Sequence, residues 1–106
     1  MDDKEILQKL FNAIEMCGWF IARKEKTIHI IKSELDYCLM IRFPQTPKEI
    51  FDDIDDFCNN FSEDGYVEAR VRLIHKGLKS YYDVANKARD IYTALTDLQM
   101  AIQDVF

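Results

Sequence analysis

The sequence predicts an α+β protein in which helices pack on one face of an antiparallel four-stranded sheet. Apolar residues recur every three or four positions in three stretches and alternate with polar residues in others. The chain has 106 residues, of which 48% are apolar and 31% charged. That size suits one hydrophobic core. We therefore expect residues 1–106 to form a single domain.

A helix is expected first, at about residues 4–17. Its apolar positions have helical spacing from Ile6 to Cys17. Asp2 or Asp3 can cap its start. Gly18 can end it because glycine adopts the left-handed conformation without strain.

Three strands are expected next. Residues 19–25 and 27–32 are rich in isoleucine and aromatic side chains and are separated by a charged turn, which predicts a hairpin. Residues 36–43 alternate between apolar and polar side chains and predict a third strand, which Pro44 ends.

The second helix has the clearest start in the chain. Thr46, Pro47 and Glu49 supply an N-cap, a proline in the first turn and the returning carboxylate of a capping box. Residues 66–74 then alternate in polarity and predict a fourth strand. Ser80 and Asp83 resemble another capping box, and the chain has no glycine or proline beyond them. The expected order is α-β-β-β-α-β-α, with a long C-terminal helix.

The C-terminal helix carries a regular apolar stripe. Its members are spaced by four and three residues in turn: Val84, Ala88, Ile91, Leu95, Leu98, Ile102 and Val105. A helix of about 26 residues is ~39 Å long, whereas a strand of the expected length spans only ~25 Å. The last turns should therefore extend past the sheet, where helix 4–17 or a second subunit can cover them. We predict the second, a homodimer with its interface at Leu98, Ile102, Val105 and Phe106.

The strongest charge feature is an acidic run of seven carboxylates without a base. It consists of Glu49, Asp52, Asp53, Asp55, Asp56, Glu63 and Asp64. Such a surface can bind a basic protein or imitate a phosphate backbone, and it can also be a solvated helix face. Asn60, Ser62, Asp64 and Gly65 match the front of a calcium loop, but Val71 stands where that loop needs glutamate. We expect no metal and no cofactor.

No catalytic pattern is visible. His29 and His75 lack a recognisable acid or thiol partner, and Cys17, Cys38 and Cys58 include no close pair, so we expect reduced thiols and no enzyme. The net charge of −5 makes nucleic acid an unlikely partner. Basic residues that would share the outer sheet face, Arg42, Arg70 and Arg72, are read as solvated rather than as an RNA surface.

Localisation is expected to be cytoplasmic, without a membrane partner. The N-terminus opens with acids rather than a basic signal region, and no apolar run approaches the ~20 residues that span a bilayer.

From Phe43 through the last helix, the chain resembles small acidic proteins of phages, plasmids and conjugative elements of gut Firmicutes. The residues that carry the resemblance are Thr46 and Glu49, Phe57 and Phe61, Val67 and Glu68, and the segment 80–98. It implies a protein-binding role, most sharply that of an inhibitor of a basic host defence nuclease of the anti-CRISPR or anti-restriction type. The alternative is an accessory or antitoxin-like regulator associated with DNA or with a mobile-element protein.

Overall fold

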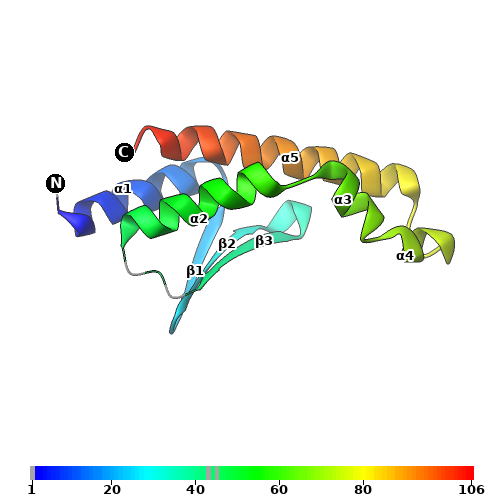
Figure 1. Ribbon diagram of the computed structural model, residues 1–106, viewed down its shortest axis with the longest axis horizontal. Coiled ribbons are helices and arrows are strands. Elements are labelled where there is room, and N and C mark those ends of the chain that lie inside the picture. The colour runs from blue at the N-terminus through cyan, green and yellow to red at the C-terminus, as the bar shows by residue number, and fades with distance from the viewer. Residues whose placement is uncertain (1, 43, 45) are drawn as a thin grey trace.

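The computed structural model describes residues 2–42, 44 and 46–106 (Figure 1). The elements in chain order are helix α1 (Asp3–Met16), strands β1 (Phe20–Lys24) and β2 (Thr27–Lys32), a 3-10 turn η1 (Ser33–Leu35), strand β3 (Tyr37–Arg42), and helices α2 (Pro47–Asn60), α3 (Glu63–Glu68), α4 (Val71–His75) and α5 (Tyr81–Gln103). The fold is therefore α+β, as predicted, with a long C-terminal helix.

The sheet has three antiparallel strands among the described residues, in the order β1-β2-β3. Because side chains alternate across a strand, each strand has an inner and an outer face. The inner face is apolar and buried, with Ile28 and Ile30 opposite Ile41 and Leu39. The outer face includes Phe20 and the paired residues His29 and Met40, and all three keep some solvent exposure. The sheet therefore has one packed face and one open face.

The three long helices lie on the inner face (Figure 1). Helix α1 contacts β1, α2 contacts β3, and α5 packs against both helices on the side away from the sheet. The core between these layers is formed by side chains from every long element, including Leu10 and Ile14 of α1, Ile54 of α2, and Leu95 of α5.

The predicted helix starts are confirmed by their capping bonds. Asp2 accepts a hydrogen bond from the Glu5 backbone N–H at 2.9 Å, and Thr46 accepts one from the Glu49 N–H at 3.2 Å. Ser80 accepts from the Asp83 N–H at 3.4 Å. Each cap satisfies one of the N–H groups that a first helical turn leaves without an intrahelical partner.

The predicted fourth strand at 66–74 is wrong, because these residues form α3, a turn and α4. Ser62 caps α3 by accepting from the Gly65 N–H at 3.1 Å, so the acids that follow it occupy a first helical turn rather than a loop. The alternation in polarity spans few residues, and Glu, Ala, Arg and Leu within it are all good helix formers. The Ser62 cap and these helix propensities therefore favour helix over strand, although polarity alternates along residues 66–74.

The stripe of α5 is covered within the chain. Leu98 and Ile102 are fully buried, and α1 and α2 flank the helix that carries them. Val105 packs at the border of the core, and the Phe106 ring meets Phe51 edge to face with centroids 4.9 Å apart. The expectation that Leu98 and Ile102 are free to contact a second chain is therefore wrong, because α1 runs beside this end of α5. At the other end of the stripe, Val84 and Ala88 are also buried, and α3 packs against α5.

Within the described part of the chain, no helix has both the length and the apolar character needed to cross a bilayer.

Candidate functional site: an acidic hollow between α2 and β3

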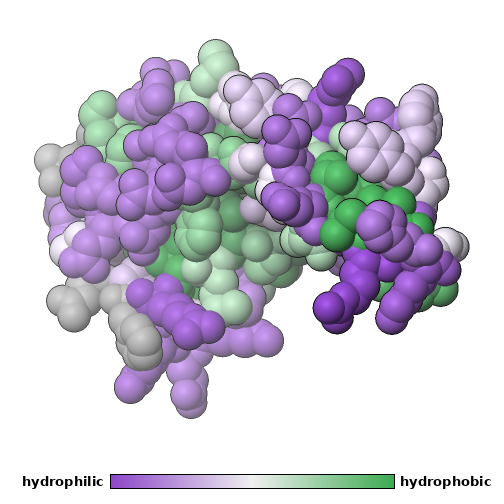
Figure 2. Space-filling view, turned by 45° about the vertical axis from the view of Figure 1, so that its right-hand side comes forward, coloured by the Kyte–Doolittle hydropathy of each residue, from purple (hydrophilic) through white to green (hydrophobic). Residues whose placement is uncertain are grey.

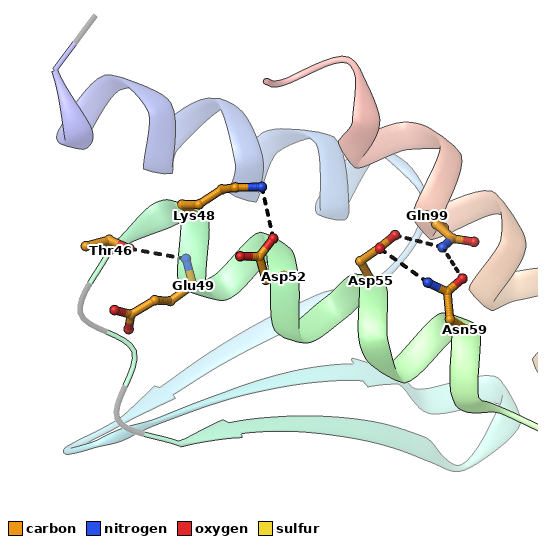
Figure 3. Close-up of polar contacts among 7 residues, drawn as sticks. All are labelled: Thr46, Lys48, Glu49, Asp52, Asp55, Asn59 and Gln99. Atoms are coloured by element: carbon orange, nitrogen blue, oxygen red, sulfur yellow. Dashed lines mark hydrogen bonds and ion pairs between the residues drawn. The ribbon is translucent and has the colours of Figure 1, made fainter.

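The seven predicted carboxylates do not form one surface. Asp55 faces α5, where it accepts hydrogen bonds from Gln99 at 2.7 Å and Asn59 at 3.3 Å (Figure 3). Asp52 pairs with Lys48 one turn earlier, at 2.9 Å. Both carboxylates therefore have structural partners on α2 or α5.

Glu49, Glu63 and Asp64 do not line the hollow described below, although the charge of Glu49 acts on Asp53 from one turn away. Glu49 lies in the first turn of α2, where its backbone N–H donates to the Thr46 hydroxyl (Figure 3). Glu63 and Asp64 occupy the first turn of α3, where the positive end of the helix dipole stabilises them. Asp53 and Asp56 are left as the two acids that share a concave surface.

That surface is a hollow of about 360 Å³ beside the edge strand β3. Its lining comes from two elements: Met40 and Arg42 of β3, and Asp53, Asp56, Phe57 and Asn60 of α2. Met40 and Phe57 are 38% and 40% exposed, so apolar surface lies directly beside the carboxylates. We call this feature the acidic hollow.

The charged side chains that line the hollow are two carboxylates and one guanidinium, so its formal charge is −1. Desolvation raises the pKa of Asp53 above its ordinary value, and the neighbouring charges of Asp56, Asp52 and Glu49 raise it further. Like charges disfavour the ionised form of a carboxyl group, so a cation placed here would relieve repulsion. The hollow can therefore bind a positively charged group that also presents apolar surface.

The sequence predicted Asp53 and Asp56 but not the side chains that make their surroundings concave. The helical spacing of Phe57 predicts a place in the buried stripe of α2, and the alternation of β3 places Met40 on the polar face of its strand. The available signal was Met40 itself, a large apolar residue between Cys38 and Arg42 on the outward positions of β3. Sequence spacing does not show that β3 lies beside α2.

A second hollow, which shares Phe57 and Asn60 with the first, is aromatic. It is lined by Tyr37, Phe61, Tyr66 and Arg70 as well. The Arg70 guanidinium lies 3.5 Å from the centre of the Tyr66 ring and donates to the Tyr66 carbonyl at 3.1 Å. Arg70 is thus a structural residue at the α3–α4 corner, and it does not lie on a sheet face with Arg42.

One pair of reactive side chains was not anticipated. The register of the sheet brings Cys38 beside His29, with Sγ and Nδ1 3.8 Å apart, and His29 Nε2 lies 3.2 Å from the Thr27 hydroxyl. Burial raises the pKa of the Cys38 thiol, whereas a nucleophilic cysteine needs a lowered one. The pair lies on the open sheet face and so lacks the enclosed setting of a catalytic dyad.

The calcium-loop residues occupy the α2–α3 junction, where Ser62 acts as a helix cap. Within residues 2–42, 44 and 46–106, no cluster of three or more histidine, cysteine or acidic side chains could hold a metal ion. The three cysteines are free thiols: Cys38 is exposed, while Cys17 and Cys58 are half-buried.

Comparison of this chain with protein-family models, curated proteins and solved structures finds no match. No residue role is therefore transferred from a relative.

Proposed function

We propose that this protein is a non-catalytic binding protein that holds a basic, partly apolar element of another protein in the acidic hollow. The observation that carries the proposal is the placement of Asp53 and Asp56 beside the exposed side chains of Met40 and Phe57. Carboxylates steer a basic partner and fix its orientation, while exposed aromatic and methionine side chains supply the apolar contact typical of an interface centre.

The sharpest form of the proposal is an inhibitor carried by a phage or other mobile element that blocks a host defence nuclease, of the anti-CRISPR or anti-restriction type. Nucleases bind phosphate backbones through basic grooves, so an acidic surface on a chain of net charge −5 can compete for the same groove. The resemblance to small acidic proteins of mobile elements supports this context.

A plaque assay tests this form. Bacteria with an active CRISPR or restriction nuclease would express the wild type, the double variant Asp53→Asn/Asp56→Asn, or the control Asp52→Asn/Asp55→Asn. The two variants remove the same charge from the same helix, but only the first pair lies in the hollow. We expect plaques of a targeted phage to increase with the wild type and the control, and to return toward background with the hollow variant.

Affinity capture from the same cells identifies the partner. Recovery of a basic nuclease that is lost with the hollow variant and with added salt supports inhibition, because salt screens exposed charges over ~8 Å at physiological ionic strength. Specific retention of DNA at that ionic strength contradicts inhibition and favours the regulator. Equal capture by the hollow variant and the control would show that Asp53 and Asp56 do not contact the partner.

A further inference from the structure

The end of the molecule opposite the chain termini is basic and apolar, unlike the rest of the chain. Residues 71–82, which we call the basic tip, contain Arg72, Lys76 and Lys79 and no acid. They also expose Val71, Leu73, Leu78, Tyr81 and Tyr82. Figure 2 shows this apolar surface, bordered by hydrophilic side chains, at the end that projects beyond the sheet. Exposed apolar surface with a polar rim marks a binding site.

The tip is held in shape although little packs against it. Helix α4 makes no extensive contact with another described element. It ends in a Schellman motif, in which the Gly77 N–H donates to the Ile74 carbonyl at 3.0 Å and the Leu78 N–H to the Leu73 carbonyl at 2.9 Å. Gly77 has φ +73°, a conformation that glycine adopts without strain. Leu78, 70% exposed, is thus presented by a defined turn.

The occupant of such a tip must combine carboxylates with apolar surface. The acidic hollow of this same chain has both, in Asp53 and Asp56 beside Met40 and Phe57. No residue of the basic tip lines the hollow of its own chain, and the tip projects while the hollow is concave. Arg42 also lines the hollow, but two carboxylates outweigh one guanidinium.

We propose that the basic tip of one chain docks in the acidic hollow of a second copy. Lys76, Lys79 and Arg72 face the carboxylates in this contact, and Leu78 covers Phe57 and Met40. Each contact joins a tip to a hollow, which are two different surfaces. Two chains can therefore pair reciprocally about a two-fold axis, with both tips engaged, or subunits can add head-to-tail into an open chain.

The inference rests on the proposed function, since both use the acidic hollow, and it adds a form of regulation. A second copy and a basic partner compete for one site, so self-association withholds the hollow until the partner displaces the tip. A variant of the tip, which keeps the hollow but cannot self-associate, should therefore bind the partner more tightly than the wild type at high protein concentration.

Sedimentation equilibrium with three proteins tests the contact. The tip variant Lys76→Glu/Lys79→Glu keeps an intact hollow, and the hollow variant Asp53→Lys/Asp56→Lys keeps an intact tip. We expect the wild type to associate at micromolar to submillimolar concentration, more weakly in high salt, and each variant alone to be monomeric. An equimolar mixture of the two should form a one-to-one dimer, because one intact tip and one intact hollow remain.

Two further variants secure the result. Leu78→Ser changes an exposed turn residue that the fold does not depend on, and we expect it to weaken association about tenfold, through loss of apolar contact. Lys4→Glu/Lys9→Glu makes the same change in charge on exposed positions of α1 and should associate like the wild type. Circular dichroism confirms that each variant is folded.

A wild type that stays monomeric at submillimolar concentration in low salt overturns the inference, as does a mixture of variants that remains monomeric. Neither result affects the proposed function, which the plaque assay tests separately. If self-association is found but plaque numbers do not depend on Asp53 and Asp56, the proposed function fails and the hollow serves assembly alone.

Discussion

The two ends of α5 are covered in different ways. Toward the C-terminus, Leu98 and Ile102 are fully buried between α1 and α2. Toward the N-terminus, α3 packs against α5 and Val84 is buried, but Tyr81 and Tyr82 in the first turn are exposed. An amphipathic stripe indicates which face of a helix is buried. How completely each turn of that face is buried depends on the elements that pack beside it.

A large effect is expected when Leu98 of α5 is compared with Leu78, which lies in the turn before that helix. Leu98→Ala should lower the free energy of unfolding by about 2–5 kcal/mol, because it removes fully buried methyl groups and leaves a cavity. Leu78→Ala should change it by less than about 0.5 kcal/mol, because that side chain is exposed. Urea unfolding measures both. Similar losses at the two positions would show that the tip packs as tightly as the bundle.

Ile102→Asp tests whether the C-terminal end of α5 lies in the core of its own chain or in an interface between subunits. If the last turns of α5 lay in an interface between subunits, this substitution would give a folded monomer. Because Ile102 is fully buried in the chain, the substitution places a carboxylate in the core and should prevent folding.

The helix caps and the sheet hairpin could be predicted because the residues that direct them are local. Thr46, Pro47 and Glu49 specify the start of α2 whatever surrounds it. The misassigned segment 66–74 has no comparable signal: its polarity fits a short strand, and only the cap at Ser62 indicates a helix. A strand also needs a partner with free edge groups, which sequence spacing does not reveal.

The candidate site was predictable in part for the same reason. The carboxylates of α2 are visible in the sequence, but Asp53 and Asp55 differ in role because one lies beside β3 and the other beside Gln99 of α5. That difference depends on long-range packing. The contact between Cys38 and His29 could not be predicted for the same reason, since His29 on β2 and Cys38 on β3 are brought together only by the register of the two strands.

The cysteines allow a second comparison, between Cys58, which packs against α5, and Cys38, which lies on the open face of the sheet. Burial, with a smaller contribution from Asp55, raises the pKa of Cys58 to about 12, and its thiol donates to the Leu95 carbonyl at 3.3 Å. A rise from 9.0 to about 12 lowers the thiolate fraction at neutral pH about a thousandfold. We expect iodoacetamide to label Cys38 first, more slowly than an unfolded thiol, and Cys58 only after unfolding. Mass spectrometry with a urea-denatured control measures this order.

Rapid labelling of Cys38 at neutral pH would contradict that expectation. It would mean that His29 activates the thiol despite the desolvation that raises its pKa, and the sheet face would become a candidate catalytic site. A Cys38→Ser variant assigns the label to this residue.

The smallest expected effect concerns Asp53, and its sign is informative. Glu49 and Asp56, one turn away on either side, are like charges that each destabilise the ionised carboxylate by a few tenths of a kcal/mol. Because the folded-state pKa of Asp53 is raised, its contribution to stability is fully present below the ordinary value of 3.8 and is lost as pH rises through the folded value. Asp53→Asn should therefore stabilise the protein at neutral pH by about 0.5 kcal/mol, a gain that disappears in acid.

Asp52→Asn is the matched control, since it breaks the ion pair with Lys48 and should cost a similar amount. Urea unfolding of both variants at neutral and acid pH compares them, and a loss of stability for Asp53→Asn at neutral pH would show that the hollow does not repel its own carboxylates.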